Sequence, residues 1–67
     1  MEEKITAWVA RDKMADLYIY NEKPYKSYYW SEWEGKCFKI DDFTLFPQIK
    51  WEDDEPTKVE ITIKICE

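Results

Sequence analysis

The chain has 67 residues, a formal net charge of −5, no histidine, one glycine and two cysteines, Cys37 and Cys66. This length predicts one small β-rich domain, residues 1–67, close to the size limit at which a chain folds without disulfides or metal. The lack of histidine excludes a serine–histidine–aspartate triad, an imidazole acid or base and a histidine-ligated zinc site.

The composition favours a folded, aromatic-rich protein over a disordered one. Four Trp, five Tyr and three Phe can each bury about 150–250 Å² of surface. The sequence begins with charged residues, has no signal-peptide pattern and contains no long apolar run. We therefore expect a cytoplasmic protein, not associated with a membrane, whose two thiols are reduced.

The first predicted elements form a hairpin. Residues 4–11 alternate in a strand pattern, and residues 17–20 are aromatic and β-branched. A four-residue loop at 12–15 is typical of a hairpin built on a type I turn, and it would place Trp8 opposite Ile19. A helix over residues 11–20 is the competing interpretation, because Met14, Leu17 and Tyr18 have helical spacing.

A second hairpin is predicted around Glu34-Gly35, which is a tight-turn pattern. It would join the aromatic residues 25–33 to a strand at 36–40, with Trp33 opposite Lys36. Its inner face would carry Tyr29, Phe38 and Ile40. Its outer face would carry Tyr28, Trp30 and Lys39.

The region from residue 41 to 56 is predicted to contain a helical turn, a short strand and an acidic loop. Asp41-Asp42 precedes a short helical turn near 42–46, because an aspartate can cap such a turn and Pro47 ends it. This turn would direct Phe43 and Phe46 toward the open end of the sheet. Residues 48–51 alternate as a short strand, and 52–55 form a solvated acidic loop.

The last element, residues 58–65, alternates polar and apolar residues over its whole length. Val59, Ile61, Ile63 and Ile65 would share one face, which predicts a strand with one buried side on which the rest of the chain assembles. The expected fold is thus all-β: an antiparallel meander of about five strands, either a rolled sheet or a small partly open barrel.

Two stretches are candidate binding surfaces. The aromatic stretch permits three interpretations: the core of a small domain, a protein-binding patch, or a platform on which single-stranded nucleic acid or sugar stacks. The acidic loop permits a solvated turn, an interaction site or a weak cation site, although it lacks the ligand spacing and glycine of a calcium loop. The candidate residues are Tyr28, Trp30, Lys39, Glu52, Asp53, Asp54 and Glu55. No catalytic residue, metal ligand or cofactor is predicted.

The charge is unevenly distributed along the chain. Residues 1–40 are electrically balanced, whereas residues 41–67 hold three lysines and eight carboxylates, so this segment carries the whole net charge of −5. Such a field repels nucleic acid and anionic membranes and could steer a basic protein partner.

Three segments of the sequence resemble those of a known group of proteins. They are residues 7–13 (AWVARDK), residues 17–24 (LYIY with Lys23-Pro24 after it) and residues 45–56 (LFP, then KWEDDEP). Together they resemble short uncharacterised proteins encoded by phages, prophages and mobile elements of gut bacteria, whose first turn often holds Asp-Gly where Met14-Ala15 stands here. Residues 25–40 have no counterpart in this resemblance, and it carries over no functional residue.

The resemblance implies a phage or mobile-element origin, and the lack of a catalytic motif together with the two candidate surfaces predicts a small non-enzymatic accessory protein that binds a host or phage protein. The alternative is an anti-defence inhibitor whose acidic C-terminal third mimics nucleic acid. The sequence gives no oligomeric state.

Overall fold

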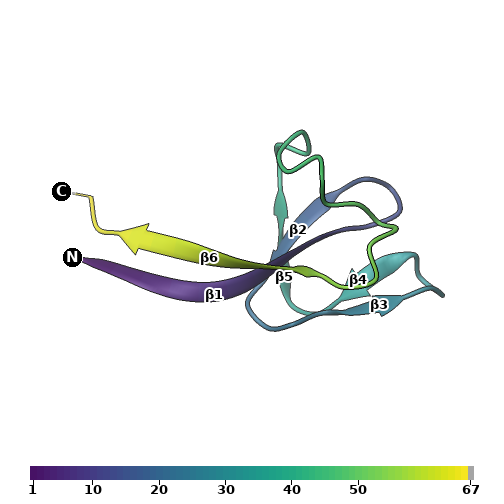
Figure 1. Cartoon of the computed structure of the whole chain (residues 1–67), viewed down its shortest axis with the longest axis horizontal. Helices are drawn as coiled ribbons and strands as arrows, with labels where there is room; N and C mark the ends of the chain where they lie inside the picture. Colours follow the sequence, from purple (N-terminus) through teal and green to yellow (C-terminus); the bar gives the residue numbers. More distant parts are fainter. Residues whose placement is uncertain (67) are drawn as a thin grey trace.

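The structure, a computed structural model, describes residues 1–66 and is built of strands, with no helix in that range (Figure 1). The strands are β1 (Glu2–Arg11), β2 (Leu17–Tyr20), β3 (Tyr25–Ser27), β4 (Glu32–Glu34), β5 (Cys37–Ile40) and β6 (Thr57–Lys64). They form a four-stranded sheet in the order β5-β2-β1-β6 and a two-stranded sheet of β3 and β4. The predicted small antiparallel all-β fold is confirmed, and the sheets do not close into a barrel.

β1 is the strand on which the fold is organised. It pairs antiparallel with β2 on one side and with β6 on the other. Because side chains alternate along a strand, its odd-numbered and even-numbered residues belong to opposite faces of the sheet. Val9 contributes to one hydrophobic cluster with Leu17 and Ile49, and Ala10 to a second cluster with Tyr20 and Trp33.

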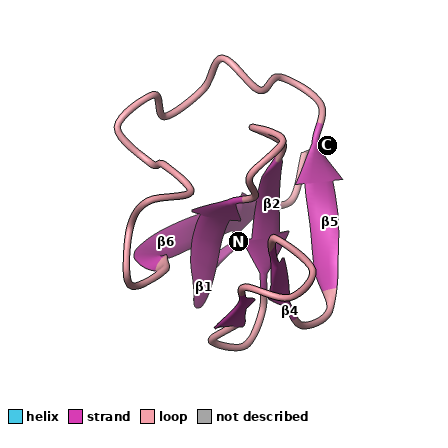
Figure 2. Cartoon of the chain, turned by 90° about the vertical axis from the view of Figure 1, so that its right-hand side faces the viewer, coloured by secondary structure: helices cyan, strands magenta, loops and turns pink. Residues whose placement is uncertain are grey.

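The face that carries Val9 is partly covered by the long connection between β5 and β6, residues 41–56. Figure 2 shows this connection arching away from the end of β5 and returning to β6. Its one buried side chain is Ile49, which packs against Val9 and Leu17. A connection without regular structure must therefore be held over the sheet by other contacts.

Arg11 supplies those contacts. Its guanidinium is buried and donates five hydrogen bonds to backbone carbonyls: Nε to Ile49 (2.8 Å), one terminal nitrogen to Ala15 (2.8 Å) and Phe43 (3.0 Å), and the other to Leu45 (2.9 Å) and Phe46 (3.2 Å). The planar, five-donor guanidinium group suits such a set of convergent acceptors. One side chain of β1 thus fixes the path of residues 43–49.

The opposite face of the sheet is covered by the β3–β4 hairpin. Trp33 is buried there, and its indole Nε1 donates to the carbonyl of Arg11 at 3.2 Å. The hydroxyl of buried Tyr20 donates in turn to the carbonyl of Trp33 at 3.2 Å. Burial raises the pKa of Tyr20 above its ordinary value, and the neighbouring Cys37 adds to that rise.

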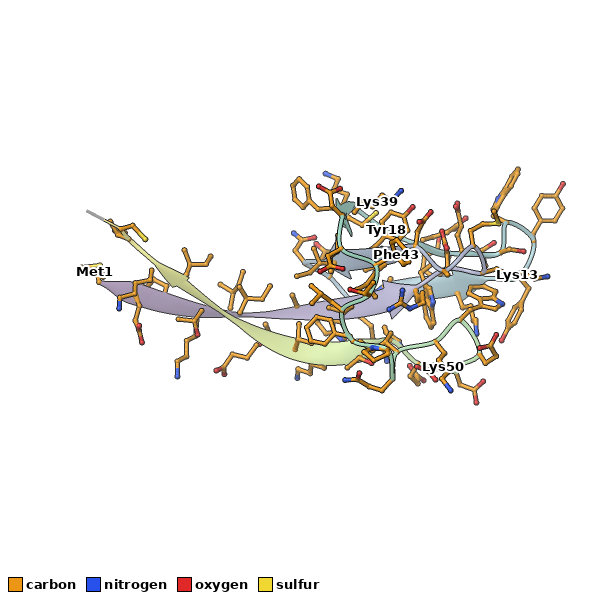
Figure 3. All side chains as sticks on the ribbon, turned by 90° about the horizontal axis from the view of Figure 1, so that it is seen from above. Met1, Lys13, Tyr18, Lys39, Phe43 and Lys50 are labelled. Atoms are coloured by element: carbon orange, nitrogen blue, oxygen red, sulfur yellow. The ribbon has the colours of Figure 1, made fainter. Side chains whose placement is uncertain are left out.

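Beyond the covered region, β1 and β6 continue as a two-stranded ribbon that carries the start of β1 and the end of β6 away from the body of the molecule (Figures 1 and 3). The pairing runs without interruption from Val9–Thr57 to Glu2–Lys64. This ribbon accounts for the elongated shape, with principal extents of 44 × 22 × 17 Å.

The predicted register of the first hairpin is wrong by one residue. Trp8 pairs with Tyr20, and Val9 pairs with Ile19. The loop between β1 and β2 has five residues, 12–16. Its two ends are joined by hydrogen bonds from the backbone N–H of Asp12 to the carbonyl of Asp16 (3.0 Å) and from the backbone N–H of Asp16 to the carboxylate of Asp12 (3.0 Å). Ala15 adopts a positive φ of 71° in this loop, a conformation usually marked in sequences by glycine or asparagine.

The predicted pairing across Glu34-Gly35 is also wrong. β4 pairs with β3, so that Lys26 lies opposite Trp33, and β5 pairs with β2, so that Phe38 lies opposite Ile19. The chain instead reverses before β4, where Ser31 has a positive φ of 56°. Gly35 forms a corner at which a Cβ atom would approach the Tyr20 ring to 3.3 Å, and this close passage lets β5 reach β2.

The region from 41 to 51 contains hydrogen-bonded turns instead of the predicted helical turn and short strand. The Asp42 carboxylate does accept from the backbone N–H of Thr44 (3.1 Å) and from its hydroxyl, and these bonds lower the pKa of Asp42. The backbone bonds of this segment, from Leu45 N–H to the Asp42 carbonyl (3.3 Å) and from Ile49 N–H to the Phe46 carbonyl (3.0 Å), form separate turns, and the positive φ of Phe46 (52°) interrupts any helix between them. Phe43 and Phe46 remain largely exposed.

The prediction that β6 has a buried face is wrong for most of its length. β6 is an edge strand, and Val59 and Ile61 are half-buried while Ile63 is 52% exposed. The alternating pattern correctly identifies a strand, but nothing among residues 1–66 covers the outer part of its apolar side.

Candidate functional site

The uncovered apolar part of the sheet is the first candidate site. We call it the bare face and define it by Ile5, Ile19, Phe38, Ile61 and Ile63, which come from all four strands of the larger sheet. Phe38 is 80% exposed and Ile5 is 43% exposed. Side chains of this size and exposure on one continuous surface are typical of an interaction site.

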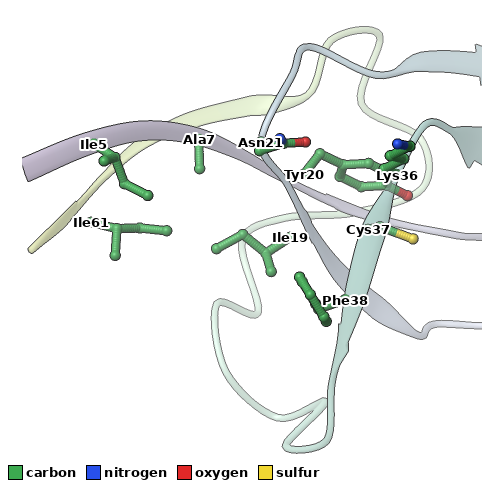
Figure 4. Close-up of a pocket in the computed structure, with 9 residues that line it drawn as sticks. All are labelled: Ile5, Ala7, Ile19, Tyr20, Asn21, Lys36, Cys37, Phe38 and Ile61. Carbon is green, nitrogen blue, oxygen red and sulfur yellow. The ribbon is translucent and has the colours of Figure 1, made fainter. Parts of the chain in front are cut away.

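A hollow of about 370 Å³ lies within the bare face (Figure 4). It is lined mainly by apolar groups, which are Ile5, Ala7, Ile19, Tyr20, Phe38 and Ile61, together with Asn21, Lys36 and Cys37. In Figure 4, Ile5 and Ile61 lie at one end of the hollow, and Phe38 and Cys37 lie toward the other. The hollow suits one or two large apolar side chains.

The register explains why these residues come together. Ile5 lies opposite Ile61 across β1 and β6, while Val9, Ile19 and Phe38 form one row across β1, β2 and β5. Ile49 packs on Val9, at the end of the face near Arg11. The connection that Arg11 holds therefore covers only one half of the apolar surface and leaves the other half open.

The polar side chains around the hollow are suited to binding a partner and include one reactive group, a thiol. Cys37 is an exposed free thiol on β5, and Lys36 and Asn21 provide polar groups beside the apolar lining. Tyr18 lies on the opposite face of the sheet, where its pKa is raised first by burial and then by the carboxylates of Asp12 and Asp16. The arrangement can bury apolar surface and donate hydrogen bonds at its margin.

The aromatic stretch predicted as a binding surface is anchored to the rest of the protein through Lys26 and buried Trp33, while its other four aromatic side chains are 63–84% exposed. The Lys26 ammonium lies 4.2 Å from the ring centroid of Trp51, 5.4 Å from that of Tyr28 and 5.5 Å from that of Trp33. It also donates to the carbonyls of Trp51 and Asp53, the latter at 2.9 Å. We call this arrangement the Lys26 cage. It fastens the β3–β4 hairpin to the 41–56 connection.

The predicted candidates Tyr28 and Trp30 lie in the turn between β3 and β4. Both are exposed, Trp30 by 63%, and Trp30 packs edge-on against Tyr29 with ring centroids 4.7 Å apart. Tyr28 packs edge-on against Trp51 at 6.1 Å. The hairpin tip is therefore a second exposed surface, and it is aromatic where the bare face is mainly aliphatic.

The third predicted residue of that surface, Lys39, lies elsewhere. It belongs to β5, opposite Tyr18, and its ammonium is 3.5 Å from the carboxylate of Asp16. The predicted outer face of Tyr28, Trp30 and Lys39 on one strand pair is not formed, because β5 pairs with β2 and not with the aromatic stretch.

The acidic candidates remain together in the loop before β6. Glu52, Asp54 and Glu55 are exposed. Asp53 has a structural role, since its carboxylate accepts a hydrogen bond from the backbone N–H of Lys50 at 3.0 Å. Glu55 lies 3.2 Å from the ammonium of Lys23, so part of the negative charge is balanced locally.

The bare face was not among the surfaces predicted from the sequence. Its isoleucines were recognised as one side of a strand, but alternation alone cannot tell whether another element covers that side. Phe38 was assigned to the inner face of a hairpin that does not exist. The exposure of Ile63 could have been inferred only from the lack of enough apolar residues elsewhere in the sequence to cover it.

Comparison with protein-family models, curated proteins and solved structures finds no match for this chain. None of the elements within residues 1–66 is a helix long and apolar enough to cross a membrane. The same residues hold no group of three or more histidine, cysteine, aspartate or glutamate side chains placed to share a metal ion.

Proposed function

We propose that this chain is a small non-enzymatic accessory protein of a phage or mobile element, and that it binds another protein through the bare face. The observation that supports this proposal is the 80% exposed Phe38 beside a hollow of about 370 Å³ that is lined mainly by apolar groups. Burying apolar surface contributes about 25 cal/mol per Å². A large uncovered apolar surface in a chain of this size therefore favours association.

The partner would present a short apolar segment with basic residues around it. Apolar side chains would fill the hollow, and the net charge of −5 favours a partner of opposite sign. This proposal agrees with the phage or mobile-element origin implied by the three segments, residues 7–13, 17–24 and 45–56.

The alternative, a nucleic-acid mimic, finds less support in the acidic segment. Lys23 lies against Glu55, and Lys26 bonds the carbonyl of Asp53, so two lysines lie within the surface that would imitate phosphates. Salt dependence separates the two functions: a mimic should lose its target steeply as salt rises, whereas binding through Phe38 should change little.

Photo-cross-linking tests the proposed surface. A photoreactive phenylalanine analogue replaces Phe38 in one variant and Trp30 in a matched control, since both positions are exposed aromatics on different surfaces. We expect a bacterial lysate to give a discrete cross-linked protein from position 38 and none from position 30. Adducts from position 30 alone would assign binding to the hairpin tip and refute the bare face.

A further inference from the structure

The open edge of β6 is the feature that leads beyond the proposed function. β6 is the last strand of the four-stranded sheet. The backbone N–H of Ile65 donates to the carbonyl of Met1 at 3.2 Å and continues the β1–β6 register. Hydrogen-bonded and non-hydrogen-bonded pairs alternate along an antiparallel ladder. Odd-numbered residues of β6 therefore direct their N–H and C=O groups toward β1.

The even-numbered residues of β6 direct their backbone groups away from β1, toward the open edge. These residues are Lys58, Glu60, Thr62 and Lys64. An edge of this length with unpaired backbone groups is a template for another strand. Since β1 bonds only the backbone groups of the odd-numbered residues of β6, a second strand can bond those of the even-numbered residues without disturbing the existing sheet.

The charges along this edge match a second copy of the same strand in one register. If two copies of β6 pair antiparallel with Thr62 opposite Thr62, Glu60 of each copy lies opposite Lys64 of the other. Opposite charges directly across a strand pair are stabilising, and like charges are destabilising. The pairing then contains two symmetric ion pairs.

The neighbouring symmetric registers are less favourable. With Ile61 opposite Ile61, Lys58 would face Lys64; with Glu60 opposite Glu60, two carboxylates would meet. With Ile63 opposite Ile63, Glu60 would lie opposite Cys66 and form no ion pair. The charge pattern therefore selects the register centred on Thr62.

The apolar side of β6 is complementary in the same register. Ile61 of each copy lies opposite Ile63 of the other, and Val59 lies opposite Ile65. Ile63 and Ile65 are 52% and 63% exposed in the single chain, so each gains an apolar neighbour. A two-stranded ribbon is marginally stable by itself, whereas two ribbons joined along β6 form a four-stranded one.

We propose that the chain forms a two-fold symmetric dimer in which β6 pairs antiparallel with β6 of a second copy, with Thr62 on the two-fold axis. The two four-stranded sheets join edge to edge. The bare faces of both copies then lie on the same side of the joined sheet. The β6 edge that pairs in the dimer lies at the opposite side of the sheet from β5, which carries Phe38, so charge changes on β6 and a change of Phe38 test dimerisation and partner binding separately.

Charge reversal tests the dimer by analytical ultracentrifugation over a range of protein concentrations. We expect the unaltered chain to sediment as a dimer. Glu60→Lys and Lys64→Glu should each weaken self-association by about tenfold or more, because two attractive pairs become repulsive. An equimolar mixture of the two variants should form a heterodimer, and the double variant should dimerise again.

Lys58→Glu is the matched control. It makes the same change in charge as Lys64→Glu on the same strand and face, but it lies opposite Cys66 in the proposed register and should leave self-association unchanged. Thr62→Pro removes an N–H that the single chain does not use, and it should abolish the dimer while thermal unfolding stays cooperative.

A chain that remains monomeric at high concentration would overturn the proposal. So would a dimer that is insensitive to charge reversal but dissociates on Phe38→Ser, since that result would assign self-association to the bare face.

Discussion

Replacing Arg11 with lysine should destabilise the protein more than any other conservative change on its surface or in its core. The guanidinium makes five hydrogen bonds, between 2.8 and 3.2 Å long, to carbonyls of Ala15 and of residues 43–49. A lysine ammonium has three donors on one nitrogen and cannot reach acceptors spread around a planar group. At least two charge-assisted hydrogen bonds are lost.

The size of the effect follows from those losses. A hydrogen bond to a charged group contributes about 1.5–3 kcal/mol to stability. The freed carbonyls of Phe43, Leu45 and Phe46 belong to exposed residues and can partly rehydrate, which reduces the net loss to about 2–3 kcal/mol. In a domain of this size that loss lowers Tm by about 10–20 °C.

Circular dichroism melts and amide hydrogen exchange measure this effect. Exchange should become faster first at Leu45 and Ile49, whose amides take part in the turns of the connection. Lys13→Arg is the control, because it exchanges the same two residue types at an exposed position and should change stability by less than about 0.5 kcal/mol. A Tm for Arg11→Lys within about 2 °C of the unaltered chain, with unchanged exchange at residues 43–49, would show that Arg11 does not hold the connection.

Three further predictions concern stability. Lys26→Met should lower the free energy of unfolding in urea titrations by about 1–2 kcal/mol and shift the tryptophan fluorescence, because the ammonium is removed from three aromatic rings. The control Lys23→Met breaks only an exposed ion pair and should change neither the free energy of unfolding nor the fluorescence. Burial raises the pKa of Tyr20 above its unfolded value of 10.0, so the stability that the neutral phenol contributes is complete below about pH 10 and is lost as the pH rises further. The urea concentration at the unfolding midpoint should therefore decrease as the pH is raised above 10, and it should decrease less steeply in Tyr20→Phe. Ile63→Lys should keep a cooperative melt and lose about 1 kcal/mol, because this side chain is 52% exposed; complete unfolding would mean that the outer half of β6 is buried after all.

The sequence by itself determined where β1, β2, β5 and β6 lie and that the strands pair antiparallel, but it also predicted a strand at 48–51 that does not form and did not predict that residues 25–33 divide into β3 and β4. Alternation at residues 4–11 and 58–65 and the aromatic, β-branched residues 17–20 identify β1, β6 and β2, because side-chain period is a local property of an extended chain. It also indicated an exposed acidic loop at 52–55, since adjacent carboxylates repel one another. The reversal at Ala15 was predicted with a loop one residue too short, and the reversal at Ser31 was missed; both residues have a positive φ without the glycine or asparagine that usually marks one.

Only the tertiary structure decided which strands are neighbours and which surfaces remain open. The pairing of β6 with β1 and of β5 with β2 joins segments far apart in the sequence, and no local pattern encodes that choice. No local pattern predicted that Arg11 and Lys26 hold other segments in place, because only the fold brings backbone carbonyls and aromatic rings around them. The bare face exists because the connection fastened by Arg11 covers one half of an apolar sheet and leaves Phe38, Ile61 and Ile63 without cover. Coverage depends on the whole chain, and for that reason alternation could predict the strand but not the site.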